Sequence, residues 1–241
     1  MEPGGPPDRT APRLGTVTET PSHATIYTTL DGEHRHELEV KRSRFITVLR
    51  RATTEDEARA LVAGLRREFH DARHHCSAFV LGPDRTTQRS SDDGEPSGTA
   101  GIPMLEALLR RQTHDGVADL SDVAAVVVRY FGGILLGAGG LVRAYSESVS
   151  AALDTAPLLR RRRLRLVGID VPHAAAPRLE NDLRAGGVLV VGTDYGADGA
   201  TLRVALEDTD AGGVAFAARL AGLTAGTAEP VRLGTSWVDV R

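Results

Sequence analysis

Hydrophobic and polar positions in the first third of the chain follow the periods of strands and of one helix. Residues 24–30 predict a strand, Asp31-Gly32 is a turn signal, and residues 36–51 predict at least one further strand. Thr54 and Glu57 form a candidate capping box, which predicts the start of a helix. The apolar residues behind this box share one helical face, and they are Ala58, Leu61, Val62, Leu65 and Phe69.

The middle of the chain predicts two buried strands and two helices around a long polar stretch. The short, mostly apolar segment 76–81 predicts a strand, and the unbroken apolar run 123–128 is typical of a strand that is buried on both faces. Pro103 stands at a first-turn position and predicts a helix through Arg111, and residues 141–154 predict another helix. Residues 82–101 are polar without periodicity, and loops of that length are often functional.

The last third of the chain predicts the order β-α-β-β-α-β, which is typical of ferredoxin-like domains. Glycine, proline or aspartate marks each break in the pattern. The expected elements are a strand at 164–171, a helix at 177–185, strands at 188–195 and 200–206, a helix at 211–223 and a strand at 230–240. We expect the arginine run 160–163 to interrupt the preceding pattern.

These patterns divide the chain into a tail and two domains. Residues 1–23 are rich in proline, glycine and threonine, and we expect them to be disordered. The boundary near Ala156–Pro157 then separates a domain at 24–156 from a ferredoxin-like domain at 157–241. The predicted fold class is therefore α+β.

Composition restricts the classes of protein. The chain has 241 residues, of which 41% are hydrophobic and 25% charged, a mix that excludes wholesale disorder and fibrous repeats. The net charge of −3 argues against a strongly basic nucleic-acid-binding protein. The single Cys76 excludes an internal disulfide framework and a multi-cysteine zinc site. No apolar run reaches the roughly 18 residues of a membrane helix, and the N-terminus lacks a signal-peptide core, so we expect a cytoplasmic protein.

The loop 89–101 is the first candidate site. Its carboxylates Asp92, Asp93 and Glu95 could together bind a hard cation, and its exposed amides near Gly94 could bind an anion. A polar loop with side-chain-to-backbone turns is an equally good interpretation.

The glycine-rich loop 131–140 is the second candidate site, because a strand, a glycine loop and a helix start together suit anion binding. Arg129 and Arg143 flank the loop and could clamp a phosphate or carboxylate. Tight packing of strand against helix is the alternative. Either way, we expect at least one of these glycines to have φ > 0 or to lie against another backbone: Gly132, Gly133, Gly137, Gly139 and Gly140.

Two smaller clusters remain. His74 and Cys76 can share one face of a strand, as metal ligands or as a base and nucleophile, whereas His75 faces the other side. A satisfied histidine and a buried cysteine are the commoner outcome. The basic segments 41–44 and 160–163 could contact phosphate or form solvated faces.

Two long motifs carry a resemblance to a known family. DDGEPSGTAGIPMLEAL at 92–108 and VVVRYFGGILLGAGGLVRAYSE at 126–147 together resemble the YigZ/IMPACT family. KRSRFI at 41–46 resembles the family's entry motif, and His74 matches its histidine before a short strand. Residues 160–241 resemble the second domain of bacterial members, which is similar to the C-terminal domain of elongation factor G.

The resemblance implies both a fold and a setting. It implies an α+β sandwich with a left-handed β-α-β unit in the first domain, like the second domain of a small-subunit ribosomal protein. Eukaryotic members of the family regulate translation through a partner that senses stalled ribosomes. The resemblance therefore implies a link to RNA, to the ribosome or to a translation-related protein.

We hypothesise a cytoplasmic two-domain binding protein rather than an enzyme, with no cofactor, no resident metal and no membrane partner. The arginines would contact phosphate, with Arg129 and Arg143 converging at the mouth of the glycine loop and the loop carboxylates orienting them. The candidate binding residues are Lys41, Arg44, His74, Arg89, Ser90, Asp92, Asp93, Gly94, Glu95, Arg129, Tyr130, Gly132, Gly133, Gly139, Gly140 and Arg143.

Two other classes of function compete with this hypothesis. A hydrolase or phosphate-handling enzyme would use Asp92, Asp93 and Glu95 together with His74. A protein-interaction module would need no ligand at all. A closed pocket around these residues would favour the enzyme, a positive groove would favour nucleic acid, and an exposed apolar patch would favour a protein partner.

Overall fold

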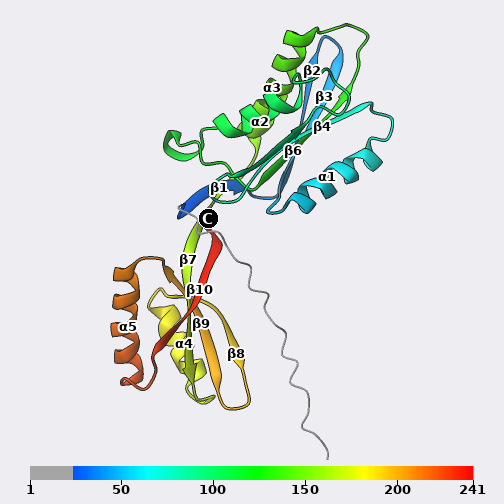
Figure 1. Cartoon of the computed structure of the whole chain (residues 1–241). Coiled ribbons are helices and arrows are strands. Elements are labelled where there is room, and N and C mark those ends of the chain that lie inside the picture. The colour runs from blue at the N-terminus through cyan, green and yellow to red at the C-terminus, as the bar shows by residue number, and fades with distance from the viewer. Residues whose placement is uncertain (1–23, 241) are drawn as a thin grey trace, which may run out of the picture.

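The computed structural model describes residues 24–240 and contains two antiparallel β-sheets with helices packed on them (Figure 1). This arrangement confirms the predicted α+β class. The first sheet has the strand order β2 (Glu33–Val40), β3 (Ser43–Arg51), β6 (Val123–Tyr130), β4 (His74–Leu81) and β5 (Thr87–Ser91).

Helices cover both faces of the first sheet. Helix α1 (Glu55–Glu68) lies on one face, and α2 (Gly101–Arg110) and α3 (Ala138–Thr155) lie on the other (Figure 1). The central strand β6 therefore sends alternate side chains into two different cores: Val123, Ala125 and Val127 into one, and Ala124, Val126 and Val128 into the other. This double burial is the reason for the unbroken apolar run in its sequence.

Strands β3 and β4 flank β6, and each is antiparallel to it. The two strands therefore run parallel to each other and are joined through α1, which forms the β-α-β unit that the resemblance implies. Thr54 caps α1 as predicted, because its hydroxyl accepts a hydrogen bond from the Glu57 N–H at 3.2 Å. The Glu57 carboxylate accepts from the backbone N–H of Thr53 at 2.6 Å, one residue before the cap.

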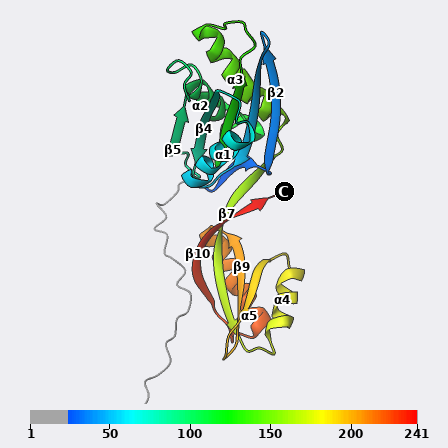
Figure 2. The ribbon, with the colours of Figure 1, turned by 90° about the vertical axis from the view of Figure 1, so that its right-hand side faces the viewer.

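The second sheet has the order β10-β7-β9-β8 in its main part, and the predicted β-α-β-β-α-β succession is present (Figure 2). The buried residues of its core lie between Val167 and Ala228, in these elements and the connections between them. The elements are β7 (Leu158–Val171), α4 (Ala176–Ala185), β8 (Leu189–Tyr195), β9 (Ala200–Glu207), α5 (Asp210–Thr224) and β10 (Pro230–Val240).

Strand β1 (Ile26–Leu30) pairs with the first part of β7 and so belongs to the second sheet. The ring of its Tyr27 lies edge-on against Trp237 of β10, with 4.8 Å between the ring centroids. The Tyr27 hydroxyl donates a hydrogen bond to Asp122, the residue directly before β6 of the first sheet. Arg51 of β3 forms an ion pair of 2.8 Å with Asp239 of β10. The two sheets are therefore joined by polar contacts as well as by the chain.

Residues 36–51 lie in the two strands β2 and β3, which agrees with the expectation of at least one strand there. Two expectations about element boundaries were wrong. The polar stretch 82–101 contains the edge strand β5, which shows no apolar period because it pairs on one side only and has no fully buried side chain. The arginine run 160–163 lies within β7, where β1 and β10 pair with it on both sides and Asp208 and Asp239 balance its charge.

The structure does not test two further expectations, the disordered tail and the domain boundary. The predicted disordered tail, residues 1–23, lies outside the described residues. The domain boundary near Ala156–Pro157 stays a prediction. Within residues 24–240, no helix is both long enough and apolar enough to cross a membrane.

Candidate functional site

Asp92 organises the loop between β5 and α2. Its carboxylate accepts three backbone N–H bonds, from Gly98 at 2.8 Å, Ala100 at 3.0 Å and Gly101 at 2.8 Å. Partial burial raises the pKa of this carboxyl, but the three N–H donors outweigh it and hold the pKa below its usual range. Since two of the donors belong to the start of α2, Asp92 also caps that helix, whose own cap residue Ala100 has no side chain able to do so.

Asp93 is committed to a different set of partners. Its carboxylate accepts from the backbone N–H of His75 at 2.6 Å and from Arg66 of α1 at 2.5 Å. Asp92 and Asp93 therefore both bind hydrogen-bond donors of the protein itself. Among residues 24–240 the structure forms no cluster of three acidic, histidine or cysteine side chains suited to a metal, so the cation interpretation of this loop receives no support.

Glu95 lies in a buried network that the sequence alone does not reveal. Its Oε1 accepts from Arg129 Nη1 at 2.7 Å and from the Tyr145 hydroxyl of α3 at 2.8 Å. The Cys76 thiol donates to the same Tyr145 oxygen at 3.3 Å. Burial raises the pKa of Tyr145 strongly and that of Cys76 to about 12, so both groups stay protonated. Cys76 is accordingly a buried structural thiol.

Arg129 belongs to the same network, and its guanidinium has more N–H groups than there are acceptors around it. Its Nη2 reaches Ser43 Oγ only at 3.5 Å, and its buried Nε has no hydrogen-bond partner among the described residues. The guanidinium lies over the rings of Phe45 and Phe131, with 5.5 and 5.8 Å to the ring centroids. Cation–π attraction compensates part of the desolvation, but it leaves donors unsatisfied.

The glycine loop confirms the expectation about backbone conformation. A Cβ at Gly132 would overlap the backbone carbonyl of Arg42, because the loop crosses the β2–β3 hairpin at close range. Gly133 has φ +85° and Gly137 has φ +70°. Gly137 is the N-cap of α3 and offers no side chain to the free N–H groups of that helix.

Gly139, Gly140 and Arg143 lie in α3 itself, so the glycine loop is shorter than predicted. Arg143 is exposed, and its Nε bonds to the Gly139 carbonyl one turn back at 3.3 Å. It lies on the outer side of the helix, since Leu141, Ala144 and Tyr145 form the buried side. The expected convergence of Arg129 and Arg143 was therefore wrong: the helical period turns Arg143 away.

Four predicted residues have surroundings other than the Arg129 network: Lys41, Arg44, Arg89 and Ser90. Lys41 occupies the tip of the β2–β3 hairpin with φ +47°. Arg44 binds Glu37 through two hydrogen bonds of 2.7 and 3.0 Å and covers the Tyr130 ring, 5.6 Å from its centroid. Arg89 and Ser90 lie exposed on the edge strand β5, remote in register from β3.

A cleft of about 800 Å³ brings four of the predicted residues together: His74, Glu95, Arg129 and Tyr130. The predicted binding residues do not include the other lining residues, although five of them belong to the candidate loop 131–140. These other residues are Asp71, Arg73, Pro96, Phe131, Leu135, Leu136, Gly137, Ala138 and Leu141. The sequence of the glycine loop did contain a signal that could have identified these residues, because large apolar residues lie between its glycines. Phe131 is 56% exposed and Leu135 83% exposed, which is unusual for such side chains.

Known proteins match this chain over both sheets. The family model described as the Impact N-terminal domain matches residues 41–153. The IMPACT family member YvyE of Bacillus subtilis is 43% identical over 158 residues, which are 66% of this chain and 70% of that protein. The IMPACT family member YigZ of Escherichia coli is 41% identical over 191 residues, 78% of this chain and 89% of that protein.

The chain belongs to the IMPACT family. A solved structure described as that of a hypothetical protein is also similar, with a TM-score of 0.61, 36% sequence identity, and coverage of 86% of this chain and 97% of that one. All sixteen predicted binding residues lie in the part of the chain that the Impact N-terminal model matches. The cleft is thus a feature of the IMPACT module itself.

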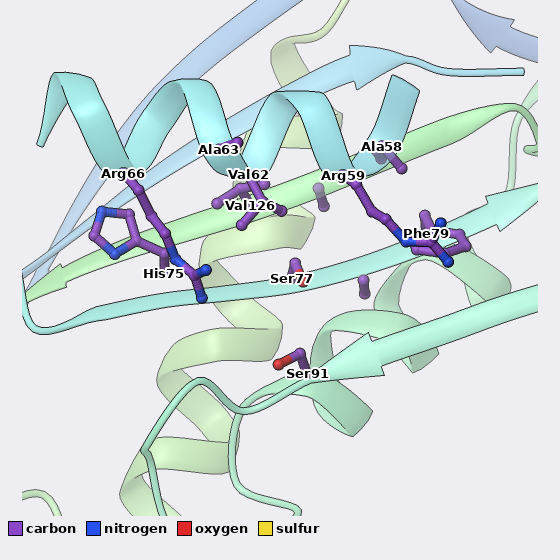
Figure 3. Close-up of a pocket in the computed structure, with 13 residues that line it drawn as sticks. Ala58, Arg59, Val62, Ala63, Arg66, His75, Ser77, Phe79, Ser91 and Val126 are labelled. Atoms are coloured by element: carbon purple, nitrogen blue, oxygen red, sulfur yellow. The ribbon is translucent and has the colours of Figure 1, made fainter. Parts of the chain in front are cut away.

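A second, smaller cavity of about 230 Å³ lies beneath α1 (Figure 3). Its floor consists of residues of β4, β5 and β6, which include the small Ser77 and Ser91 as well as His75 and Phe79. Arg59 and Arg66 extend from α1 toward the strands (Figure 3). Both arginines are already paired, Arg59 with Glu55 and Arg66 with Asp93. None of the predicted binding residues lines this cavity.

The histidines follow the predicted alternation along β4. His74 lines the cleft, and Cys76 packs in the core under α2 and α3. His75 is buried on the opposite face, beside α1, where desolvation lowers the pKa of its imidazole despite the nearby Asp93 carboxylate. His74 binds the Asp93 carbonyl, whereas Cys76 binds the Tyr145 hydroxyl in the core. The two side chains therefore form neither a metal pair nor a nucleophile–base pair.

Proposed function

We propose that this IMPACT-family chain is a cytoplasmic two-domain protein that binds RNA in the translation apparatus, and that the cleft is its contact surface. The observation that carries the proposal is Arg129, a guanidinium that lines an open cleft at the N-terminus of a helix and whose Nη2 reaches Ser43 Oγ only at 3.5 Å. A buried cation with surplus donors attracts an anion that can supply acceptors. In RNA, that anion is a phosphate.

The start of α3 supports a phosphate at this position. Gly137 and Ala138 line the cleft, and the helix begins there without a side-chain cap. The first N–H groups of an uncapped helix and its macrodipole together favour an anion. Arg73 lies on the same rim, is exposed, and has no ion pair within the part of the chain that the structure describes. It supplies a second, mobile cation.

Phe131 and Leu135 supply what a nucleobase requires. Phe131 presents a largely exposed aromatic ring at the cleft, beside the Arg129 guanidinium. Stacking of a base on an exposed aromatic ring contributes about 1–3 kcal/mol and tolerates every base. The cleft then fits a nucleotide of a single strand, with its phosphate toward α3 and its base on Phe131. Because the net charge of the chain is −3, we expect few phosphate contacts and a shallow salt dependence.

The hydrolase alternative fares less well on this geometry. The carboxylate oxygens of Asp92 and Asp93 already accept hydrogen bonds from backbone N–H groups and from an arginine. Glu95 is held by Arg129 and Tyr145. No pair of carboxylates is left to act as acid and base in the way that the hydrolase hypothesis requires.

The test uses two exposed side chains, Arg73 and Phe131, that make none of the hydrogen bonds of the buried network. Binding of a labelled single-stranded RNA of about 10 nucleotides is measured by fluorescence anisotropy, and ribosome binding by co-sedimentation. Arg73→Ala and Phe131→Ala should each weaken RNA binding about tenfold, and Arg73→Ala should also lower the salt slope by about one. Arg67→Ala, an exposed arginine on α1 outside the cleft, is the matched control.

Two outcomes would contradict the proposal. Equal RNA affinity of wild type, Arg73→Ala and Phe131→Ala would remove the cleft as the contact surface. Loss of ribosome binding in Phe131→Ala, combined with no RNA binding by the wild type, would instead identify the exposed apolar loop as a surface for a protein partner.

A further inference from the structure

The imidazole of His74 is fixed in one tautomer. Its Nδ1 lies 2.9 Å from the backbone carbonyl oxygen of Asp93. A carbonyl can only accept, so Nδ1 carries the proton and donates it, and the neutral ring keeps its lone pair on Nε2. Histidines that serve as acceptors or bases are commonly oriented by such a bond to backbone.

The loop that holds the ring is itself rigidly placed. Asp93 and Gly94 both adopt left-handed conformations, with φ +43° and +85°, which turns the Asp93 carbonyl toward His74. Gly94 packs against the ring, since a Cβ there would lie 3.5 Å from Nδ1. The Asp93 carboxylate anchors the same turn to β4 through the His75 N–H. The direction of the His74 ring is therefore set before any ligand arrives.

His74 Nε2 is accessible and has no hydrogen-bond partner among the described residues, and the residue lines the cleft. The nearby arginines, Arg73 and Arg129, are donors and suit a phosphate. The Tyr130 hydroxyl already donates to Asp71 at 2.6 Å. A hydrogen-bond acceptor beside cationic donors suits a ligand that carries a hydroxyl next to a phosphate.

We propose that Nε2 of His74 accepts a hydrogen bond from a ribose 2′-hydroxyl, so that the cleft selects RNA over DNA. The inference rests on the proposed function, because it assumes that a nucleic-acid phosphate occupies the cleft. In RNA the 2′-hydroxyl is a donor adjacent to the 3′-phosphate, and DNA lacks it. One neutral hydrogen bond of this kind corresponds to about a five- to tenfold difference in affinity.

The experiment compares three single strands of one sequence: RNA, DNA and RNA with 2′-O-methyl groups, which lack the donor. Wild type should bind the RNA about five- to tenfold more tightly than either of the others. His74→Asn keeps an N–H near Nδ1 for the Asp93 carbonyl but removes the Nε2 acceptor, and it should bind all three strands equally. His74→Gln places an amide oxygen near Nε2 and should restore part of the preference.

The melting temperature of each variant shows whether the loop has survived the substitution. Equal wild-type affinity for the three strands would overturn the His74 inference and leave RNA binding at the cleft standing. A preference for RNA that persists in a folded His74→Asn variant would also overturn it. Absence of binding to every strand would overturn the proposed function and the inference together.

Discussion

Nη1 of Arg129 lies 2.7 Å from Oε1 of Glu95, and the two side chains are only 8% and 4% exposed. The pair connects the end of β6 to the loop before α2, two segments separated by 34 positions in the chain. Two charges buried this deeply are costly to desolvate, and each depends on the other for compensation. The pair therefore holds one wall of the cleft in place.

Removal of one member of this pair should destabilise the fold. We expect Arg129→Met to lower the free energy of unfolding by about 3–5 kcal/mol, because it leaves the Glu95 carboxylate buried without its cation. The double variant Arg129→Met/Glu95→Leu should lose less than the sum of the two single variants. Urea denaturation measures all three, with the exposed Arg67→Met as control. Strictly additive effects would show that the two residues do not depend on each other.

Asp92 should make stability depend on pH in acid. Its pKa in the folded chain lies below the unfolded value of 3.8, so its contribution is present above about pH 3.8 and is lost as pH falls through the folded pKa. Asp92→Asn should cost about 1–3 kcal/mol at pH 7, since it weakens bonds to three N–H groups. The stability gap between wild type and variant should narrow below pH 3.8. A gap that is constant from pH 7 to pH 3 would contradict this assignment.

Two glycines of one motif should respond in opposite directions to alanine. Gly132→Ala should destabilise by more than about 1 kcal/mol, because its Cβ would overlap the Arg42 backbone and one of the two segments must move. Gly139→Ala, in the first turn of α3 with open space around it, should be neutral or stabilise by up to about 1 kcal/mol. Thermal unfolding distinguishes them. Equal midpoints for both variants would mean that the close crossing does not exist.

Cys76 should be unreactive in the folded protein. With its pKa raised to about 12 by burial, roughly one thiol in ten thousand is ionised at pH 8, and only the thiolate attacks. A disulfide reagent should therefore label Cys76 at the rate of unfolding, with full labelling in urea as the control. Rapid labelling of the native chain would show that local opening of the structure exposes the thiol to solvent more often than its contact with Tyr145 indicates.

Residues 157–241 should fold as a separate fragment, although with reduced stability. The core of the second sheet lies wholly within this segment, but the fragment lacks β1 and the ion pair between Arg51 and Asp239. Emission of Trp237, the only tryptophan, should report one cooperative unfolding transition at a lower urea midpoint than in the full chain. A fragment without a cooperative transition would place the boundary elsewhere or show that the second unit needs β1.

Local sequence patterns predicted most of the helices and strands, because the formation of these elements depends largely on interactions between residues that are close in the chain. The cap at Thr54, the apolar face of α1 and the alternation in β7 each depend on neighbours within a few positions. The strand β5 escaped prediction because an edge strand with a single partner needs no apolar side chain. The start of α3 was misplaced since two glycines in its first turn suggest a loop, although packing of the later residues is enough to extend the helix.

Periodicity, turn residues and residue identity along the chain were sufficient to predict most of the elements, the double burial of β6 and the family motifs. Which charged side chains meet depends on how distant segments pack together. Asp92, Asp93 and Glu95 are near neighbours in one loop, yet their partners are helix amides, Arg66 and Arg129. A carboxylate that is shielded from water must accept hydrogen bonds from the segment that packs against it. The fold of the whole sheet decides which segment that is.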